Sequence, residues 1–132
     1  MRHRKKGRKL GRKNGNRRAL LMNLASQLVV HKRIKTTDAK AKELRSFIEP
    51  LITLAKKDNL HSRRMVTRKL PHKNIVKSLF KEVAPSYVDR PGGYTRIIKL
   101  GYRDNDRAPV SIIEFVDMVE ISISEEKETD AS

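Results

Sequence analysis

The sequence predicts an α+β fold, in which several helices pack on a small, two- or three-stranded β-sheet behind a basic, extended N-terminal arm. Two patterns predict this fold. Up to residue 85, apolar residues recur at intervals of three and four, as they do in amphipathic helices. After residue 93, two runs are rich in β-branched and aromatic residues, which favour strands.

The length of 132 residues suits one domain with a modest core. We expect a flexible basic arm over residues 1–16, a single α+β domain over 17–119 and an acidic tail over 120–132. The arm and the tail have few apolar side chains to bury, so neither is expected to fold alone. Charge follows a similar division, because residues 1–112 hold 30 Lys and Arg against 8 Asp and Glu, whereas residues 113–132 hold 1 against 7.

The first helix is expected to start at Asn16, whose side chain can cap it, and to run through RRALLMNLASQLVVHKR. A short strand at RIKT, around Ile34, would separate it from a second helix capped by Thr36 or Thr37. That helix, DAKAKELRSFIEPLITLAKK, has the clearest apolar stripe of the chain. Pro50 in its middle predicts a kink, or two shorter helices, because proline lacks a backbone N–H and its ring crowds the preceding turn.

Two further helical segments are expected before the strands. The first follows Asn59, places Leu60, Met65 and Leu70 toward the core, and ends before the proline after Leu70. The second is KNIVKSLFKEVAP, whose apolar residues again recur at three and four, and Pro85 is expected to end it.

The strands are expected at YTRIIKLGYR and PVSIIEFVDM, joined by the polar loop DNDRA as an antiparallel hairpin. The preceding DRPGG, residues 89–93, has the residues of a turn. A lone hairpin is only marginally stable in water, so this one must pack on the helices. The segment around Ile34 is the candidate for a third strand.

The absence of Cys excludes disulfides, thiolate zinc sites and cysteine nucleophiles, and it suits a reducing compartment. No apolar run approaches the roughly 18 residues that a membrane helix needs, and the N-terminus lacks the apolar stretch of a secretory signal. We therefore expect a soluble, cytoplasmic protein with no membrane partner.

No residue pattern predicts catalysis, a metal site or a cofactor. The four histidines, His3, His31, His61 and His72, fall in separate segments without a second ligand at a metal-binding spacing. The Ser and Thr residues lack a nucleophile motif, and the glycines of KKGRKLGRKNGN do not form a nucleotide-binding loop. The few Phe and Tyr residues do not form a base-stacking motif.

The positive charge predicts a polyanionic partner. The first eighteen residues, MRHRKKGRKLGRKNGNRR, contain ten Lys or Arg and no acid, which is more than solubility requires. Flexible Arg-rich arms suit folded RNA, because they become ordered among phosphates that a rigid domain cannot reach. Outward cations of the third helix, Arg63, Arg64, Arg68 and Lys69, would extend this contact onto the body. The alternative for them is a plain solvated helix face.

Several motifs of the chain resemble a known family. They are, in order from residue 1 to about residue 118, MRHRKKGRKLGR, IKTTDAKAKELR, EPLIT, GGYTRI and APVSIIE. Together they are similar to the L17 family of bacterial large-subunit ribosomal proteins. The resemblance implies a non-enzymatic structural constituent of the large ribosomal subunit, whose basic arm enters large-subunit ribosomal RNA. It also implies a neighbouring ribosomal protein of the L32 family.

The resemblance further implies which residues contact RNA. They are basic residues of the arm, of the start of the first helix and of the segment before TTDAKAK: Arg2, His3, Arg4, Lys5, Lys6, Arg8, Lys9, Arg12, Lys13, Arg17, Arg18, Lys32, Arg33 and Lys35. The four cations of the third helix named above complete the predicted set.

Two segments depart from the family pattern. VEISISEEKETDAS runs past the usual family core, and its acids should be repelled by RNA, so we expect it to face solvent or a basic neighbouring protein. The loop in GYRDNDRAP is less basic than the family's loop, so RNA contact there is not expected.

Two other classes of function remain as alternatives. A DNA-compacting protein would use the same Lys and Arg residues without needing a particular RNA shape. Duplex DNA would then displace it from ribosomal RNA as readily as RNA does. An enzyme acting on RNA would need an acid–base pair near the basic face.

Overall fold

The computed structural model describes residues 14–70 and 72–117. The predicted tail and residues 1–13 of the predicted arm lie outside these residues. Within them the predicted α+β fold is confirmed, with helices packed on a three-stranded antiparallel sheet. The α-helices are α1 (Asn14–His31), α2 (Asp38–Lys57), α3 (Leu60–Lys69) and α4 (Lys73–Ser78). The strands are β1 (Arg33–Thr37), β2 (Thr95–Tyr102) and β3 (Pro109–Phe115).

The sheet has the order β1-β3-β2, so the segment around Ile34 supplies the third strand as predicted. Ile34 lies opposite Ile113 of β3, and Ile113 lies opposite Ile97 of β2. The ladder of β2 and β3 shifts register between Lys99 and Gly101. Gly101 has a φ of +111°, a conformation that glycine adopts at little cost.

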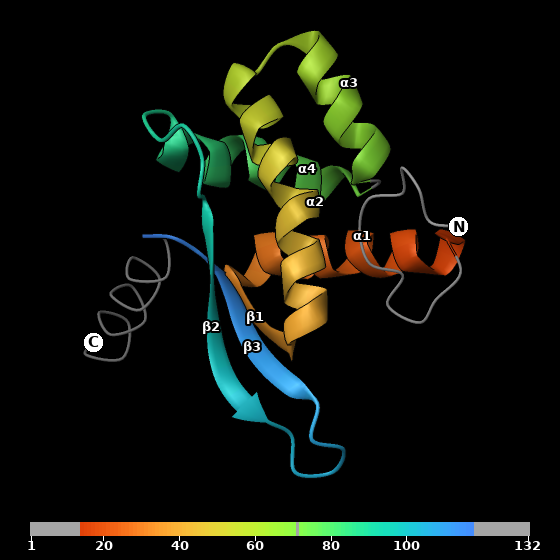
Figure 1. Ribbon diagram of the computed structural model, residues 1–132. Helices are drawn as coiled ribbons and strands as arrows, with labels where there is room; N and C mark the ends of the chain where they lie inside the picture. Colours follow the sequence, from red (N-terminus) through yellow and green to blue (C-terminus); the bar gives the residue numbers. More distant parts are fainter. Residues whose placement is uncertain (1–13, 71, 118–132) are drawn as a thin grey trace, which may run out of the picture.

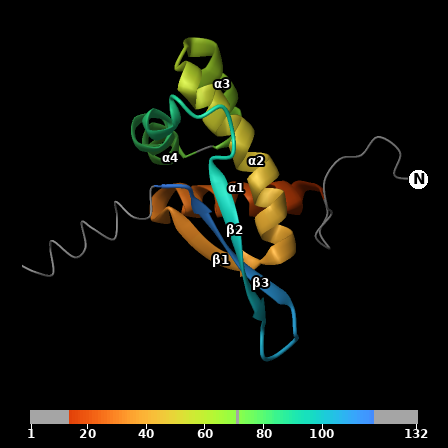
Figure 2. The same ribbon diagram turned by 60° about the vertical axis from the view of Figure 1, so that its left-hand side comes forward.

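Helix α2 forms the centre of the molecule, because it contacts all three strands as well as α1 and α3 (Figure 1). Its apolar stripe is buried, as its spacing predicts, by Ala41, Leu44, Ile48, Leu51, Ile52 and Ala55. Leu28 of α1 and Ile113 and Phe115 of β3 belong to the same core. The turn of the β2–β3 hairpin projects beyond the helices at the end of the molecule opposite α3 (Figures 1 and 2).

The ends and the middle of two helices differ from the prediction. Helix α1 begins at Asn14, so Asn16 lies inside the helix and is not its cap. The first turn of a helix tolerates Asn and Gly, because its N–H groups have no partner within the helix. Helix α2 is continuous through Pro50, so the prediction of two shorter helices is wrong. Pro50 is exposed, and the burial of Ile48 and Leu51 on either side holds both halves in one core.

Helix α3 buries a different face from the one predicted. Leu60 and Met65 are 64% and 37% exposed, and Leu70 alone of the predicted three is buried. Ser62 and Val66 face inward with Leu70, because these three positions are spaced by four residues and therefore share one face. Asn59 caps the helix, since its side-chain oxygen accepts the N–H of Ser62 at 2.7 Å.

Pro85 does not end the last helical segment. After α4 the chain continues as a π-helical segment, η1 (Leu79–Val83), and a 3₁₀ turn, η2 (Ala84–Tyr87). Pro85 lies in the first turn of η2, where the 3₁₀ turn does not need its backbone N–H as a donor. The predicted apolar face holds, because Leu79 and Val83 are buried.

Candidate nucleic-acid interface

Half of the predicted RNA-binding residues can be placed. Arg2, His3, Arg4, Lys5, Lys6, Arg8, Lys9, Arg12 and Lys13 lie outside the described residues. Arg17, Arg18, Lys32, Arg33, Lys35, Arg63, Arg64, Arg68 and Lys69 are described. They fall into three groups, on α1 and α3, beside α4, and around β1. Arg17 lies half-buried on α1 and has an interaction of its own.

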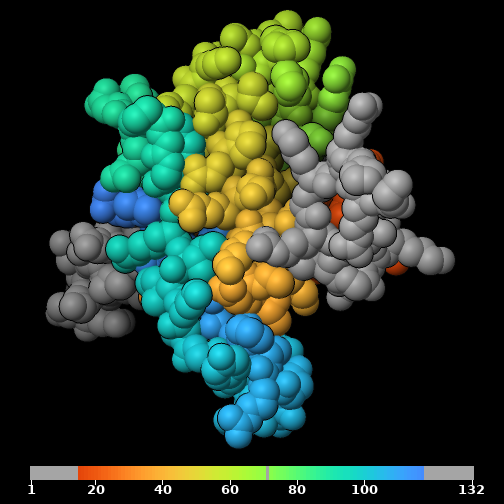
Figure 3. All heavy atoms as spheres, in the orientation of Figure 1, coloured from red at the N-terminus to blue at the C-terminus, as the bar shows by residue number. Residues whose placement is uncertain are grey.

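The first group gathers cations from segments far apart in the sequence. Arg18 of α1 and Arg68 and Lys69 of α3 line one hollow of about 380 Å³, which we call the first hollow. Met22, Phe47 and Met65 supply its apolar part. The three cations are exposed and make no ion pair or hydrogen bond within the described ranges. Arg64 is also exposed on α3, which packs against α2 at the end of the molecule away from the hairpin (Figure 3).

The second group surrounds α4. Arg63 and Lys73, Lys77 and Lys81 line a hollow of about 390 Å³ with Thr67, Val76 and Phe80, which we call the second hollow. The three lysines were not among the predicted RNA-binding residues. Their spacing of four residues is the signal that could have identified them, because it places them on one edge of a helix.

The third group, around β1, has much of its charge neutralised. The Nζ atom of Lys32 lies 2.9 Å from Glu82 Oε2, and the side chain of Lys32 is only 14% exposed. The Nε atom of Arg33 lies 3.5 Å from the carboxylate of Glu114. Lys35 is exposed beside the hairpin and lines neither hollow. The structure therefore does not bring these three residues together with Arg18 and Arg68.

Glu114 is a buried carboxylate, 1% exposed, and it lies between two arginines. In the sheet it is opposite Arg33 on one side and Arg96 on the other. Arg96 both hydrogen-bonds to and ion-pairs with Glu114. Arg33 therefore has a structural contact inside the protein in addition to its predicted contact with RNA.

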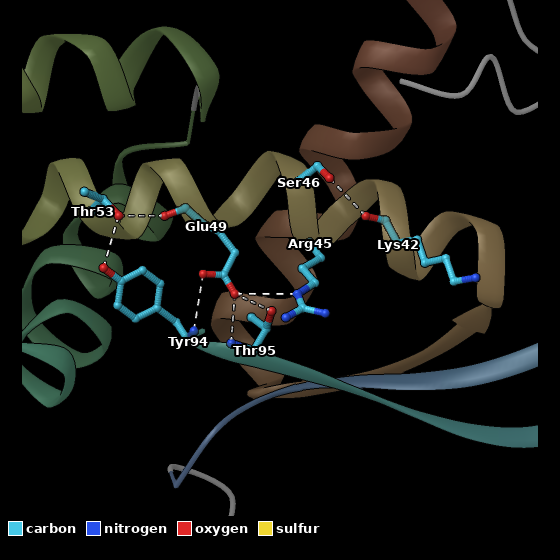
Figure 4. A network of polar contacts seen from close by, with 7 residues as sticks. All are labelled: Lys42, Arg45, Ser46, Glu49, Thr53, Tyr94 and Thr95. Atoms are coloured by element: carbon cyan, nitrogen blue, oxygen red, sulfur yellow. Dashed lines mark hydrogen bonds and ion pairs between the residues drawn. The ribbon is translucent and has the colours of Figure 1, made fainter. Parts of the chain in front are cut away.

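A second carboxylate, Glu49, ties α2 to the start of β2 (Figure 4). It accepts the N–H of Tyr94 at 3.2 Å, the N–H of Thr95 at 3.1 Å and the hydroxyl of Thr95 at 2.8 Å. Thr53, one turn further along α2, lies 3.1 Å from the hydroxyl of Tyr94. These bonds fix the hairpin on α2 and so keep the helices and the sheet in one arrangement.

The groups with shifted pKa values lie outside both hollows. Burial raises the pKa of Tyr87, whose hydroxyl donates to the carbonyl of Val116 at 2.6 Å. Hydrogen bonds from Lys42 and Ser111 lower the pKa of Asp38. Residues 14–70 and 72–117 contain no group of three or more His, Cys, Asp or Glu that could hold a metal ion. None of the described helices is long and apolar enough to cross a membrane.

These features define a class of protein, a small α+β domain with cations gathered at two hollows on its helices. Comparison with known proteins then identifies the family. A family model described as ribosomal protein L17 matches residues 20–116. A protein of Pelobacter propionicus described as large ribosomal subunit protein bL17 is 52% identical over 117 residues, which cover 89% of this chain and 92% of that protein. The chain belongs to the ribosomal protein L17 family.

Membership in this family confirms the resemblance expected from the motifs. Proteins of the family are structural constituents of the bacterial ribosome, and the predicted cytoplasmic location agrees with this.

Proposed function

We propose that the protein binds large-subunit ribosomal RNA through its basic N-terminal arm and the basic faces of its helices, and that it stabilises folded RNA as a non-enzymatic part of the large subunit. One observation carries the part of this proposal that concerns the body. Arg18 of α1 and Arg68 and Lys69 of α3 meet at the first hollow, whose described lining includes no acid. A polyanion placed there would meet three cations that have no partner within the described ranges.

Continuity of the chain supports a joint role for the arm and the first hollow. Helix α1 begins at Asn14, so the basic residues before it join the body within two turns of Arg18. An RNA segment bound by the arm would therefore pass close to the first hollow. Arg64 and Lys35 would add further contacts. Lys32, Arg33 and Arg63 hold ion pairs within the protein, and Arg17 also has an interaction of its own, so these four are expected to contribute less.

The proposed partners are large-subunit ribosomal RNA and neighbouring large-subunit proteins. Among the latter, a member of the L32 family is proposed on the family resemblance alone. Chemical crosslinking of assembled large subunits tests it, and repeated absence of any L32-family crosslink would contradict it.

The test of RNA binding compares three variants with the natural protein by co-sedimentation with large subunits at several salt concentrations. Deletion of residues 2–13 removes the basic arm. The triple variant Arg18→Gln, Arg68→Gln, Lys69→Gln removes the cations of the first hollow. The control variant Lys40→Gln, Lys57→Gln, Lys99→Gln removes as much charge from other positions.

The expected result is a loss of binding that deepens with salt. The triple variant should lower the slope of log affinity against log salt by about two to three, since each phosphate contact contributes roughly 0.7 to 0.9. The control variant should change this slope much less. Unchanged incorporation of both the deletion and the triple variant would contradict the proposal.

Competition separates this proposal from a general DNA-binding role. RNA folded as in the large subunit presents a particular shape, so duplex DNA should displace the protein only at much higher concentration. Equal displacement by duplex DNA would favour the DNA-compacting alternative.

A further inference from the structure

The second hollow differs from the first in having an arginine guanidinium over its aromatic ring, that of Arg63 over Phe80. Phe80 and Val76 lie one turn apart, both are half-buried against the core, and both line the hollow. We infer that this hollow binds a single unpaired nucleotide of RNA, with the base stacked on the Arg63 guanidinium, which lies over Phe80, and the flanking phosphates on the lysines. The inference rests on the proposed function and assigns one further contact to it.

The surface that would receive the base has two flat groups. The guanidinium carbon of Arg63 lies 5.4 Å from the centre of the Phe80 ring. Aromatic rings and guanidinium planes are the groups on which proteins stack unpaired bases, because every base has a flat π face. An RNA duplex cannot use such a surface, since its bases are already stacked within the helix.

Arg63 is held in place before any ligand arrives. Its Nη2 and Nε atoms both donate to Asp58 Oδ1, at 2.7 and 2.9 Å. These hydrogen bonds favour the placement of the guanidinium over Phe80, so less side-chain freedom is lost on binding than for an unpaired arginine. This pair also explains why Arg63 is better suited to stack on a base than to neutralise a phosphate.

Lys73, Lys77 and Lys81 supply the charge at the rim. All three are exposed, and none makes an ion pair or hydrogen bond in the part of the chain that the structure describes. The described lining of the hollow contains no acid, so its charge is complementary to phosphate. An apolar helix of a partner protein would leave these cations unpaired, which makes a nucleotide the better occupant.

The experiment measures the affinity of the full-length protein for two short RNA hairpins that differ only in one unpaired nucleotide in the stem. The arm and the first hollow should bind both hairpins alike, so the ratio of the two affinities isolates the second hollow. We expect the natural protein to prefer the bulged hairpin by roughly fivefold to a hundredfold, as one stacked base contributes.

A blocking variant tests whether this preference arises in the second hollow. Thr67 lines the hollow from α3 and is exposed, so Thr67→Met should fill the space beside Val76 and Phe80 without disturbing the core. The variant should bind both hairpins with equal affinity. Lys73→Gln with Lys77→Gln should weaken the bulged complex more than the other and lower its salt slope, while the matched control Lys57→Gln with Lys99→Gln should retain the preference. Thermal unfolding confirms that each variant is folded.

Three outcomes would overturn the inference. Equal affinity of the natural protein for both hairpins, with salt-sensitive binding and normal co-sedimentation, would remove the nucleotide site and leave the proposed function intact. A preference that survives Thr67→Met would place its origin elsewhere in the chain. Absence of salt-sensitive binding to either hairpin, together with loss of co-sedimentation, would remove both the proposed function and this inference.

Discussion

Glu49 and Thr95 are joined by two hydrogen bonds to one carboxylate oxygen, since Glu49 Oε1 accepts both the N–H and the hydroxyl of Thr95. The pair links residues 46 positions apart in the sequence. Thr95 is only 3% exposed, so water cannot replace the lost acceptor easily.

Replacing Glu49 should therefore loosen the attachment of the hairpin. Glu49→Ala is expected to lower the free energy of unfolding by about 2–3 kcal/mol, because buried donors on Tyr94 and Thr95 lose their acceptor. Glu49→Gln keeps one acceptor oxygen and should cost less. Urea unfolding measures both, and equal stability of Glu49→Ala and the natural protein would show that the network contributes nothing.

The stability of the protein should respond differently to removal of the Glu114 carboxylate and to removal of its two arginine partners. Glu114→Gln leaves two arginines that are about half exposed, 44% for Arg33 and 58% for Arg96, and water can solvate them. The double variant Arg33→Gln, Arg96→Gln leaves a buried carboxylate without a partner and should cost about 3–5 kcal/mol. Thermal or urea unfolding of the two variants gives the comparison. A larger loss for Glu114→Gln would contradict this account.

Asp38 should make the stability of the protein depend on pH in the acidic range. Its carboxylate accepts from Ser111 at 2.8 Å and pairs with Lys42 at 3.0 Å, and these contacts lower its pKa in the folded state. Its contribution is therefore present above the unfolded pKa of about 3.9 and is lost as the pH falls through the lower folded value. Asp38→Asn should be less stable at neutral pH and lose less stability on acidification, as measured by urea unfolding at several pH values. Asp104→Asn, in the exposed hairpin loop, is the control and should keep the natural acid dependence.

Gly101 should resist substitution for a reason that concerns only the backbone. Its φ of +111° is strained for any residue with a Cβ, although no neighbouring atom lies within 4 Å of where that Cβ would be. Gly101→Ala is expected to cost about 1–3 kcal/mol. Gly92→Ala has the same free space without the positive φ, and it should be neutral or slightly stabilising. A similar effect of both variants on the melting temperature would remove the backbone explanation.

Lys32 and Arg68 should differ in their effect on RNA affinity, although both were predicted from sequence to bind RNA. Lys32 is paired with Glu82, whereas Arg68 has no partner within the described ranges. Arg68→Gln should therefore lower the salt slope of RNA binding by about 0.7 to 0.9, and Lys32→Gln should leave it nearly unchanged. Filter binding at about 50 to 200 mM salt measures the slopes. Equal slopes for the two variants would contradict the distinction.

Features that depend on local spacing could be predicted from the sequence. The stripe of α2, the hairpin and the strand around Ile34 all follow from periodicity and from β-branched residues. The prediction of which face of α3 is buried was wrong. Met65 and Val66 are both apolar, and only packing against α2 decides which of them is buried. The family could be predicted because motifs carry more information than composition does, and comparison with known proteins confirmed it.

The candidate site depended on contacts that a linear reading cannot supply. The meeting of Arg18 with Arg68 requires the packing of both α1 and α3 on α2, and the pairing of Glu114 with two arginines requires the strand register. The spacing of Lys73, Lys77 and Lys81 places them on one edge of a helix. That Arg63 of α3 lies in the same hollow could be learned only from the structure.

The row of lysines on α4 and η1, Lys73, Lys77 and Lys81, has a further consequence for the free protein. Like charges four residues apart repel each other along a helix, and α4 has only six residues before it becomes π-helical. This segment should therefore open most readily when no anion is near, and its amide hydrogens should exchange faster than those of α2. Binding of a polyanion would relieve the repulsion, so slower exchange in this segment should accompany incorporation into the ribosome.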